Sequence, residues 1–391
     1  MKTLRDIELT GKRVLVRVDF NVPMNEAGEI TDDLRIRTVL PTLRYLLEQQ
    51  AKVILCTHMG RPKGQRVEKY SLAPVATYLG TLLGVPVRLA PDCIGPEVEK
   101  AAEALQNGEV LMLENLRFHG EEEKNDPEFS RQLASVADVY VNDAFAVSHR
   151  AHASVVGVTA HVREKAAGFL LQNEIEYFQR AMDNPQRPLV AIVGGAKVSG
   201  KLEALRNMLA KVDKMIIGGA MANTFLKSQG YSVGASKVED DLLETATELL
   251  KAAKEKNIQV YLPVDVVAAD RFAPDAVCKQ VTIQDIPEGW MALDIGPASV
   301  ICFNEVLADA KTIVWNGPMG AFEMDAYARG TMAIAHTVAS AHALSVTGGG
   351  DSNAAITQAG VADSISYMST GGGAFLELME GKILPGIKAL S

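Results

Sequence analysis

Short apolar runs rich in β-branched residues recur along the 391-residue chain, separated by longer stretches with the spacing of amphipathic helices. Within each run the apolar residues are continuous, which is typical of parallel strands covered by helices on both faces. Strands that alternate with helices predict βαβ units and doubly wound parallel sheets. The predicted strands lie within residues 13–20, 51–58, 109–118, 138–145, 189–195, 214–219, 258–265, 312–317, 344–350 and 365–373.

One helical stretch divides this series into two halves. The segment "GFLLQNEIEYFQRAMDNPQRP" (168–188) reads as a single amphipathic helix that ends in a proline-containing turn. We therefore expect an α/β protein of two Rossmann-like parallel-sheet domains, joined by a hinge helix and with a cleft between them. The predicted parts are an N-terminal domain (1–170), the interdomain helix (171–185), a C-terminal domain (186–370) and a last segment (371–391) that packs back on the N-terminal domain.

Composition and charge restrict the class of protein. Nearly half of the residues are hydrophobic (48%), which favours a folded globular protein, and the net charge of −9 argues against binding to nucleic acid or anionic lipid. The N-terminus lacks the apolar core of a signal peptide, and the four scattered cysteines favour reduced, mostly buried thiols. We expect a cytoplasmic, monomeric protein with no nucleic-acid or membrane partner.

Residues that bind anions follow the predicted strands of the first half. In a doubly wound sheet, ligands bind beyond the carboxyl ends of the strands, so these positions are informative. A single arginine there is typical of a solvated surface, but arginine or histidine follows several successive strands, and arginine presents a planar set of donors to phosphate and carboxylate. The sequence therefore predicts an anion site in the first half, made from Asp19, Asn21, Arg35, Arg37, His58, Arg61, Arg117, His149 and Arg150.

Glycines occupy the corresponding positions in the second half. Glycine lets backbone N–H groups approach a ligand closely, and helix N-termini favour phosphate. Tight turns between strands and helices are the alternative explanation, but Lys197, Lys201 and Asp351 stand among these glycines and favour a nucleotide site. The glycines are Gly194, Gly195, Gly218, Gly219, Gly317, Gly348 to Gly350 and Gly371 to Gly373.

The segment from Gly195 to Lys201 matches a phosphate-loop pattern except at its last position. Leu202 stands where serine or threonine would bind magnesium. We interpret the match as coincidental, because Asp351 is a hard oxygen ligand suited to a magnesium ion carried by a nucleotide. An anion site in one half and a nucleotide site in the other predict phosphoryl transfer across a closing cleft.

Nine motifs in this order resemble the phosphoglycerate kinase family over essentially the whole chain, at a length typical of the bacterial type. They are "RVDFNVP" (17–23), "HMGRP" (58–62), "LENLRF" (113–118), "SHRAHAS" (148–154), "VAIVGGAKVSGK" (190–201), "GGAMANTF" (218–225), "WNGPMGAFE" (315–323), "GGGDS" (348–352) and "STGGGAFLE" (369–377). The resemblance implies transfer of a phosphoryl group from 1,3-bisphosphoglycerate to MgADP, giving 3-phosphoglycerate and ATP, with no tightly bound organic cofactor.

The resemblance also implies roles for residues of the first half. Arg35 is expected near the reacting group, and Asp19 and Asn21 near the hydroxyl and carboxyl region of the glycerate. The full set expected to bind this substrate is Asp19, Phe20, Asn21, Arg35, His58, Met59, Gly60, Arg61, Arg117 and Arg150.

Residues of the second half are expected to bind the nucleotide or the group in transfer. Lys201 is expected at the phosphates, Glu323 at the ribose hydroxyls, and Asp351 at the metal. The nucleotide set is Gly194, Gly195, Lys201, Gly218, Gly219, Asn316, Pro318, Glu323, Gly349, Gly350, Asp351 and Ser352. The catalytic set is Arg35, Lys197, Gly371, Gly372 and Gly373.

Two alternatives to a kinase remain at this point. A dehydrogenase would carry G-x-G-x-x-G and an acidic residue at the end of the next strand, whereas the glycines here are adjacent and Asp213 precedes its strand. A non-catalytic nucleotide- or anion-binding protein would need only half of the predicted site. We further expect the acidic stretch 120–129 to be a solvated loop and helix start. His149 and His152 have a spacing that could bind metal, but no third ligand accompanies them, so we expect structural roles instead.

Overall fold

The computed structural model describes all 391 residues, and the chain divides into two compact units. The first unit comprises residues 1–175 and 383–391, and the second comprises residues 176–382. The C-terminal segment that belongs to the first unit begins later than expected, at residue 383 and not at residue 371. Helix α14 (Gly372–Met379) belongs to the second unit, where it packs on α8 (Leu202–Met208), and only residues 383–391 belong to the first unit.

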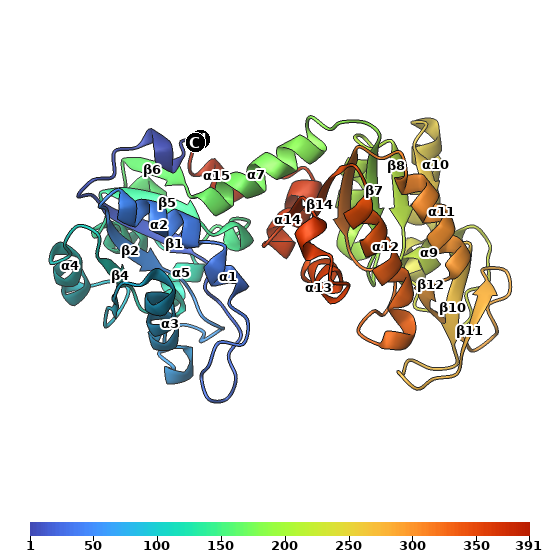
Figure 1. The fold of residues 1–391 in the computed structure, drawn as a ribbon, viewed down its shortest axis with the longest axis horizontal. Helices are drawn as coiled ribbons and strands as arrows, with labels where there is room; N and C mark the ends of the chain where they lie inside the picture. The colour runs from blue at the N-terminus through green and yellow to red at the C-terminus, as the bar shows by residue number, and fades with distance from the viewer. The chain divides into compact units, whose positions relative to one another are not determined.

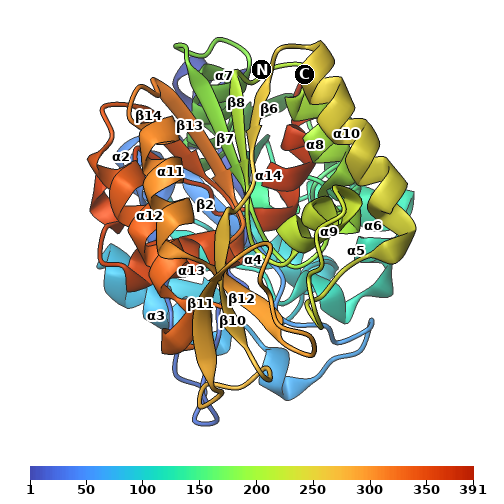
Figure 2. The ribbon, with the colours of Figure 1, turned by 90° about the vertical axis from the view of Figure 1, so that its right-hand side faces the viewer.

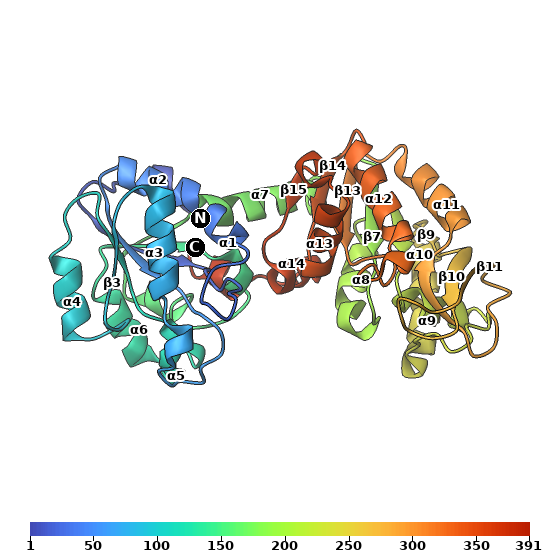
Figure 3. The same ribbon diagram turned by 60° about the horizontal axis from the view of Figure 1, so that its bottom comes forward.

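The first unit is built on a six-stranded, fully parallel sheet of order β3-β4-β2-β1-β5-β6. Helices cover it on both faces (Figures 1 and 3). The strands are β1 (Arg13–Val18), β2 (Lys52–Cys56), β3 (Val87–Leu89), β4 (Val110–Met112), β5 (Val139–Asp143) and β6 (Glu164–Ala167). The helices are α1 (Leu34–Arg37), α2 (Leu40–Glu48), α3 (Ala73–Leu83), α4 (Pro96–Glu103), α5 (Gly120–Glu123), α6 (Pro127–Ala134) and α15 (Pro385–Lys388).

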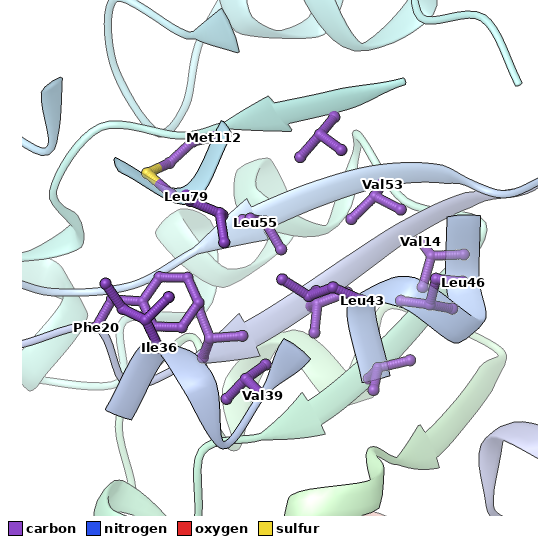
Figure 4. Packing of buried hydrophobic residues seen from close by; sticks show 14 of the residues in the cluster. Val14, Phe20, Ile36, Val39, Leu43, Leu46, Val53, Leu55, Leu79 and Met112 are labelled. Carbon is purple, nitrogen blue, oxygen red and sulfur yellow. The ribbon is translucent and has the colours of Figure 1, made fainter. Parts of the chain in front are cut away.

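Alternate residues of the central strands point to opposite faces of this sheet. Val14 and Val53 lie on the face covered by α2 and α3, where they pack with Leu43 and Leu79 (Figure 4). Every one of these side chains is fully buried, so each strand is apolar at successive positions. This burial on both faces explains the continuous apolar runs of the sequence.

The second unit is built on a second parallel sheet, of order β15-β14-β13-β7-β8-β9. Figure 2 shows α11, α12 and α13 on one face and α8, α9, α10 and α14 on the other. The strands are β7 (Leu189–Val193), β8 (Lys214–Ile217), β9 (Gln259–Tyr261), β13 (Thr312–Asn316), β14 (Leu344–Thr347) and β15 (Tyr367–Met368). The remaining helices are α9 (Met221–Ser228), α10 (Leu243–Glu255), α11 (Pro297–Leu307), α12 (Arg329–Ser340) and α13 (Gly350–Gln358).

A three-stranded antiparallel sheet, which the sequence did not predict, completes the second unit. Its order is β11-β10-β12, with β10 (Asp265–Ala269), β11 (Cys278–Thr282) and β12 (Met291–Ile295). Val266 and Ile286 contribute to a separate small core beneath it. Strand β11 is mostly exposed, so only one part of this sheet is covered.

The ten strands predicted from the apolar runs are all present, and both sheets are parallel, which confirms the fold class. The stretch predicted as one amphipathic helix forms α7 (Phe169–Met182), which begins in the first unit and ends in the second. No helix combines the length and the apolar character needed to cross a membrane.

Candidate functional site

In the first unit, polar residues from distant parts of the sequence come together at the carboxyl-terminal ends of the strands, which is called here the carboxyl edge of the sheet. In the parallel register, Arg17 of β1 stands beside Cys56 of β2 on one side and Asn142 of β5 on the other. The segments that follow these three strands therefore start from the same edge. Those segments carry most of the anion-binding residues expected from the sequence.

Asp19 and Arg35 form an ion pair at this edge. The Arg35 Nη1 donates to Asp19 Oδ2 at 2.9 Å and to the Asn21 carbonyl at 3.1 Å. The Asp19 carboxylate is 9% exposed, whereas the Arg35 side chain is 42% exposed. The buried carboxylate thus fixes the guanidinium while leaving part of it open to a ligand.

His58 is buried and faces arginine on one side. Its Nδ1 lies 3.2 Å from Arg17 Nη2 and 3.8 Å from Asp19 Oδ1. Burial, and then the charges of Arg17 and Arg117, hold the pKa of His58 well below its usual value. The imidazole is therefore neutral, and because arginine only donates, Nδ1 must accept and Nε2 carries the proton.

The loop after β2 is fixed by polar side chains from two other segments. Arg117 Nη1 donates to the Gly60 carbonyl at 2.8 Å, and Asn21 Oδ1 accepts from the Gly60 N–H at 2.9 Å. Asn115, which begins the 3-10 helix η3 (Leu116–Phe118), accepts from Met59 N–H and donates to Met59 carbonyl. Met59 itself is buried, so its expected place in the site concerns its backbone and packing.

The positive charges of this edge act on one another. Burial lowers the pKa of His152 to about 4, with further lowering by Arg17, Arg117 and Arg150. The positive charges of the three guanidinium groups therefore repel one another and disfavour protonation of both histidines. A bound anion would reduce this repulsion. Arg61 is exposed, and its side chain carries no bond to this group that fixes its position.

Sequence reasoning missed the buried network behind these residues. Glu122 is fully buried and accepts from both the N–H and the hydroxyl of Ser154, whose oxygen accepts from Arg17 Nε at 2.8 Å. Burial raises the pKa of Glu122, and Arg17 opposes this shift. The expectation that stretch 120–129 is wholly solvated is therefore wrong at Glu122, because α5 packs this side chain inward beside Arg17.

The second unit contains a pocket of about 480 Å³ next to the glycine-rich loops. Five of its lining residues were expected from the sequence: Gly195, Gly219, Pro318, Glu323 and Asp351. The others were not, and they are mostly small or apolar: Ala196, Ala220, Ala235, Lys237, Phe272, Met291, Ala292, Leu293, Gly320 and Ala321. An apolar wall with a few polar groups at its edge is typical of a site for a flat organic ring.

The glycines allow three loops to approach backbone to backbone. A side chain at Gly219, which has φ of +67°, would place Cβ 2.5 Å from the Gly195 nitrogen. At Gly317, with φ of +101°, Cβ would lie 2.2 Å from the Gly194 carbonyl oxygen. Glycine is thus required here both by conformation and by space.

Lys201 lies behind these loops. Its Nζ donates to the Gly194 carbonyl at 2.6 Å and to the Asn316 carbonyl at 2.8 Å. Burial lowers the pKa of Lys201 to about 8, and the nearby Asp351 opposes this shift. The Lys201 ammonium group is therefore hydrogen-bonded to two carbonyl oxygens. It also lies near Asp351, among the residues expected to bind the nucleotide.

Two helix N-termini lie side by side at the end of this sheet. A Cβ at Gly372, where α14 begins, would lie 3.5 Å from Gly349 Cα and 3.7 Å from the nitrogen of Gly350, where α13 begins. Together they direct backbone N–H groups and partial positive charge to one place. Ser352 differs from its expected position beside phosphates, since it is buried and its hydroxyl joins the Gly317 N–H to the Gly348 carbonyl.

A carboxylate holds the loop that carries the two lysines. Glu239 accepts from the Val198 N–H at 2.6 Å, from the Ser199 N–H at 3.1 Å and from the Ser199 hydroxyl. Burial opposes ionisation of Glu239, but the hydrogen bonds from Ser199 and Val198 outweigh it and lower the pKa, with a smaller contribution from the exposed Lys197. Because Lys197 is exposed, its side chain is directed away from the core.

Comparison with known proteins gives one consistent result. The family model for phosphoglycerate kinase matches residues 4–382. The phosphoglycerate kinase of Desulfotalea psychrophila is 70% identical over 390 residues, covering 100% of each chain, and that of Pelobacter propionicus is 60% identical over 383 residues, covering 98% and 96%. The structure of phosphoglycerate kinase from Coxiella burnetii is similar at a TM-score of 0.92 with 44% identity, covering 99% and 98% of the two chains.

These matches span both units and agree with the residues gathered in each. They favour neither a dehydrogenase nor a non-catalytic binding protein. The chain belongs to the phosphoglycerate kinase family, whose members transfer a phosphoryl group between 1,3-bisphosphoglycerate and ADP in glycolysis.

Proposed function

We propose that the two units divide the substrates of this reaction between them, the first binding the phosphoglycerate and the second the nucleotide. The observation that supports this most is the contrast in lining. Arg17, Arg35, Arg117 and Arg150 meet at one edge of the first sheet, whereas the second unit has a pocket with an apolar wall. The first arrangement suits a small polyanion and the second suits a purine base.

Within the first unit, we propose that the neutral His58 donates from Nε2 to the substrate. Arg117 and Arg150 neutralise its phosphate, and Asp19 with Asn21 lies at the hydroxyl and carboxyl region. Arg35 has the exposed guanidinium and lies nearest to the reacting group. Arg61, which is exposed, would join the site only when an anion is bound.

Within the second unit, we propose that the adenosine occupies the pocket and Glu323 binds the ribose hydroxyls. Lys201 moves from its carbonyl partners to the phosphates, whose charge it matches better. The paired N-termini of α13 and α14 receive the phosphoryl oxygens. Asp351 fits a magnesium ion bound with the nucleotide, because its exposed carboxylate lines the pocket in the first turn of α13, and magnesium takes few protein oxygens besides phosphate oxygens. A bound magnesium ion would neutralise phosphate charge.

The chemistry needs positioning and charge neutralisation more than it needs a base. In the direction that consumes ATP the acceptor is a carboxylate with an ordinary pKa of about 4, so it is already ionised at neutral pH. The transfer is direct and in line, without a covalent enzyme intermediate. Arg35, Lys197 and the N–H groups of Gly371 to Gly373 would stabilise the charge on the moving group.

We further infer that the chain acts as a monomer in the cytoplasm. Its four cysteines are free thiols, two of them buried, and the net charge of −9 favours solubility. Sedimentation at several protein concentrations tests the oligomeric state, since an association would make the apparent mass rise with concentration.

Calorimetric titration of two variants tests the division of substrates. Arg117→Ala should weaken 3-phosphoglycerate binding by about tenfold or more and leave MgADP binding unchanged, because removing a charged hydrogen-bond partner costs roughly 1.5–3 kcal/mol. Glu323→Ala should have the opposite pattern. If either variant weakens both ligands equally, or if the pattern is reversed, the proposed division is wrong.

A further inference from the structure

A group of three metal-ligating side chains lies outside the residues assigned above. Asp92, Cys93 and His119 each offer a ligand atom, and these oxygen, sulfur and nitrogen atoms all lie within 4.8 Å of one another. Asp92 and Cys93 follow β3, whereas His119 follows η3. Two loops that are distant in sequence therefore converge on one point, and they bring three chemically different ligands.

The three side chains are held in place before any ligand binds. Asp92 Oδ1 accepts from His119 Nε2 at 2.7 Å and from the Cys93 N–H at 2.7 Å. The imidazole also packs against the Phe129 ring, with 5.5 Å between centroids. Cys93 is fully buried, and Asp92 and His119 are half-buried, so the group has a closed inner end and an outer end open to solvent.

The ligand set selects one class of ion. Thiolate, imidazole and carboxylate bind zinc in tetrahedral sites, with water able to take a fourth position. Magnesium and calcium prefer oxygen ligands alone, so the sulfur and nitrogen atoms disfavour them. The imidazole and the Asp92 carboxylate are at present joined by a proton, and a metal ion can replace a bridging proton of this kind and the proton of a thiol.

We propose that Asp92, Cys93 and His119 form a zinc site that joins the loop after β3 to the segment carrying Arg117. With the imidazolium and thiol both protonated, one Zn²⁺ enters and two protons leave, one from His119 and one from Cys93. The charge of the group is zero before binding and zero afterwards, so the half-buried group gains no net charge. The bound ion would tie His119, two residues beyond Arg117, to the loop that follows the edge strand β3, which pairs with β4.

Cobalt(II) titration of the full-length, metal-free protein tests this site. Cobalt replaces zinc in such ligand sets, and a cobalt–thiolate bond gives a charge-transfer absorption in the near ultraviolet that oxygen and nitrogen ligands do not give. We expect this band to saturate at one equivalent of Co²⁺ and to be removed by Zn²⁺.

Three variants separate this site from other thiols. Cys93→Ser should abolish the band, and His119→Gln should weaken Co²⁺ and Zn²⁺ binding by more than about tenfold. Cys278→Ser removes the exposed thiol of β11 and should leave the titration unchanged. A wild-type protein without the band, a band that survives Cys93→Ser, or a band lost in Cys278→Ser would overturn the proposal. Should Cys93→Ser fail to fold, the half-buried His119→Gln variant still decides it, since unchanged Co²⁺ binding there would overturn the proposal.

Discussion

Arg35 combines a fixed anchor with an exposed guanidinium. Its Nη1 is held by Asp19 and the Asn21 carbonyl, yet the side chain is 42% exposed. A charge held in this way is suited to a group whose negative charge is redistributed in the transition state, since it needs little reorganisation. Binding of the ground-state substrate, by contrast, can rely on Arg117 and Arg150.

Replacing Arg35 with alanine should therefore lower kcat by about 100-fold while changing KM for 3-phosphoglycerate much less. Steady-state kinetics in the ATP-consuming direction measure both constants. Arg37→Ala is the matched control, because Arg37, although expected at the anion site from the sequence, is exposed and pairs with Asp33, the residue before α1. An unchanged kcat in Arg35→Ala would remove this residue from the catalytic set.

Lys201 gives the nucleotide site a dependence on pH. Burial lowers its pKa to about 8, so the free protein loses this charge as the pH rises through that value. Anionic phosphates bind the charged form, so the affinity for MgADP should fall by several-fold between pH 7 and pH 9. Calorimetric titration across this range measures the effect.

The variant Lys201→Arg provides the control for this dependence, because arginine stays charged throughout the range. Its affinity for MgADP should change little between pH 7 and pH 9, whatever its absolute value. An equal fall in affinity for wild type and variant would assign the pH dependence to another group.

At the scale of residues, the sequence singles out polar side chains that follow strands but misses buried polar groups. Asp19, Arg117 and Asp351 follow strands, and their position and type together point to chemistry. Arg17 and Glu122 have no such signal, because Arg17 lies within a strand and Glu122 within an acidic stretch that looks solvated. Their burial results from packing between β1, α5 and the segment at Ser154, which only the fold reveals.

At the scale of elements, strands within a recognisable apolar run were predictable, including β9 and β15 at the edges of the second sheet, whereas the edge strands of the first sheet were not. The missed strands β3 and β6 lie at the two edges of the first sheet, are short, and include partly exposed charged residues. The antiparallel sheet was missed as well, since β11 is largely exposed and lacks an apolar run. Met291, Ala292 and Leu293 of β12 line the nucleotide pocket, so its apolar wall could not be derived from the sequence.

The loop between β7 and α8 owes its conformation to Glu239. This carboxylate accepts two N–H groups and a hydroxyl from Val198 and Ser199, between the two lysines of the loop. Because Glu239 does not line the nucleotide pocket, we regard it as a positioning residue that acts through Lys197 and Lys201.

Glu239→Ala should lower kcat by roughly tenfold and raise KM for MgADP, as expected when a misplaced loop weakens the contacts to the nucleotide and the moving group. KM for 3-phosphoglycerate should stay unchanged. Glu239→Gln, which keeps an acceptor oxygen, should recover part of the loss. Asp240→Asn is the control, since Asp240 pairs with the exposed Lys227 instead. Equal losses for both substrates would indicate general destabilisation.

At the scale of the whole molecule, the chain places a local positive cluster in a body with a net charge of −9. On the proposed assignment, its anionic substrates would be attracted by particular arginines and not by the protein as a whole. Added salt should weaken 3-phosphoglycerate binding through screening at the partly exposed arginines, and the apolar part of nucleotide binding should be less sensitive. The affinities for 3-phosphoglycerate and for the nucleotide should therefore respond differently to added salt.

The division of the chain into two units leads to the last prediction. Phosphoryl transfer requires donor and acceptor atoms in contact, so substrates bound by different units must be brought together. Helix α7 and the return of the chain at Ile383 are the covalent connections between the units, and neither belongs to a sheet, so we expect them to permit hinge motion. Small-angle scattering should therefore show a smaller radius of gyration with MgADP and 3-phosphoglycerate together than with either alone. Glu323→Ala, measured at a nucleotide concentration that leaves it unbound, should lose this compaction. Identical scattering in all ligand states of the wild type would exclude closure as a step of the reaction.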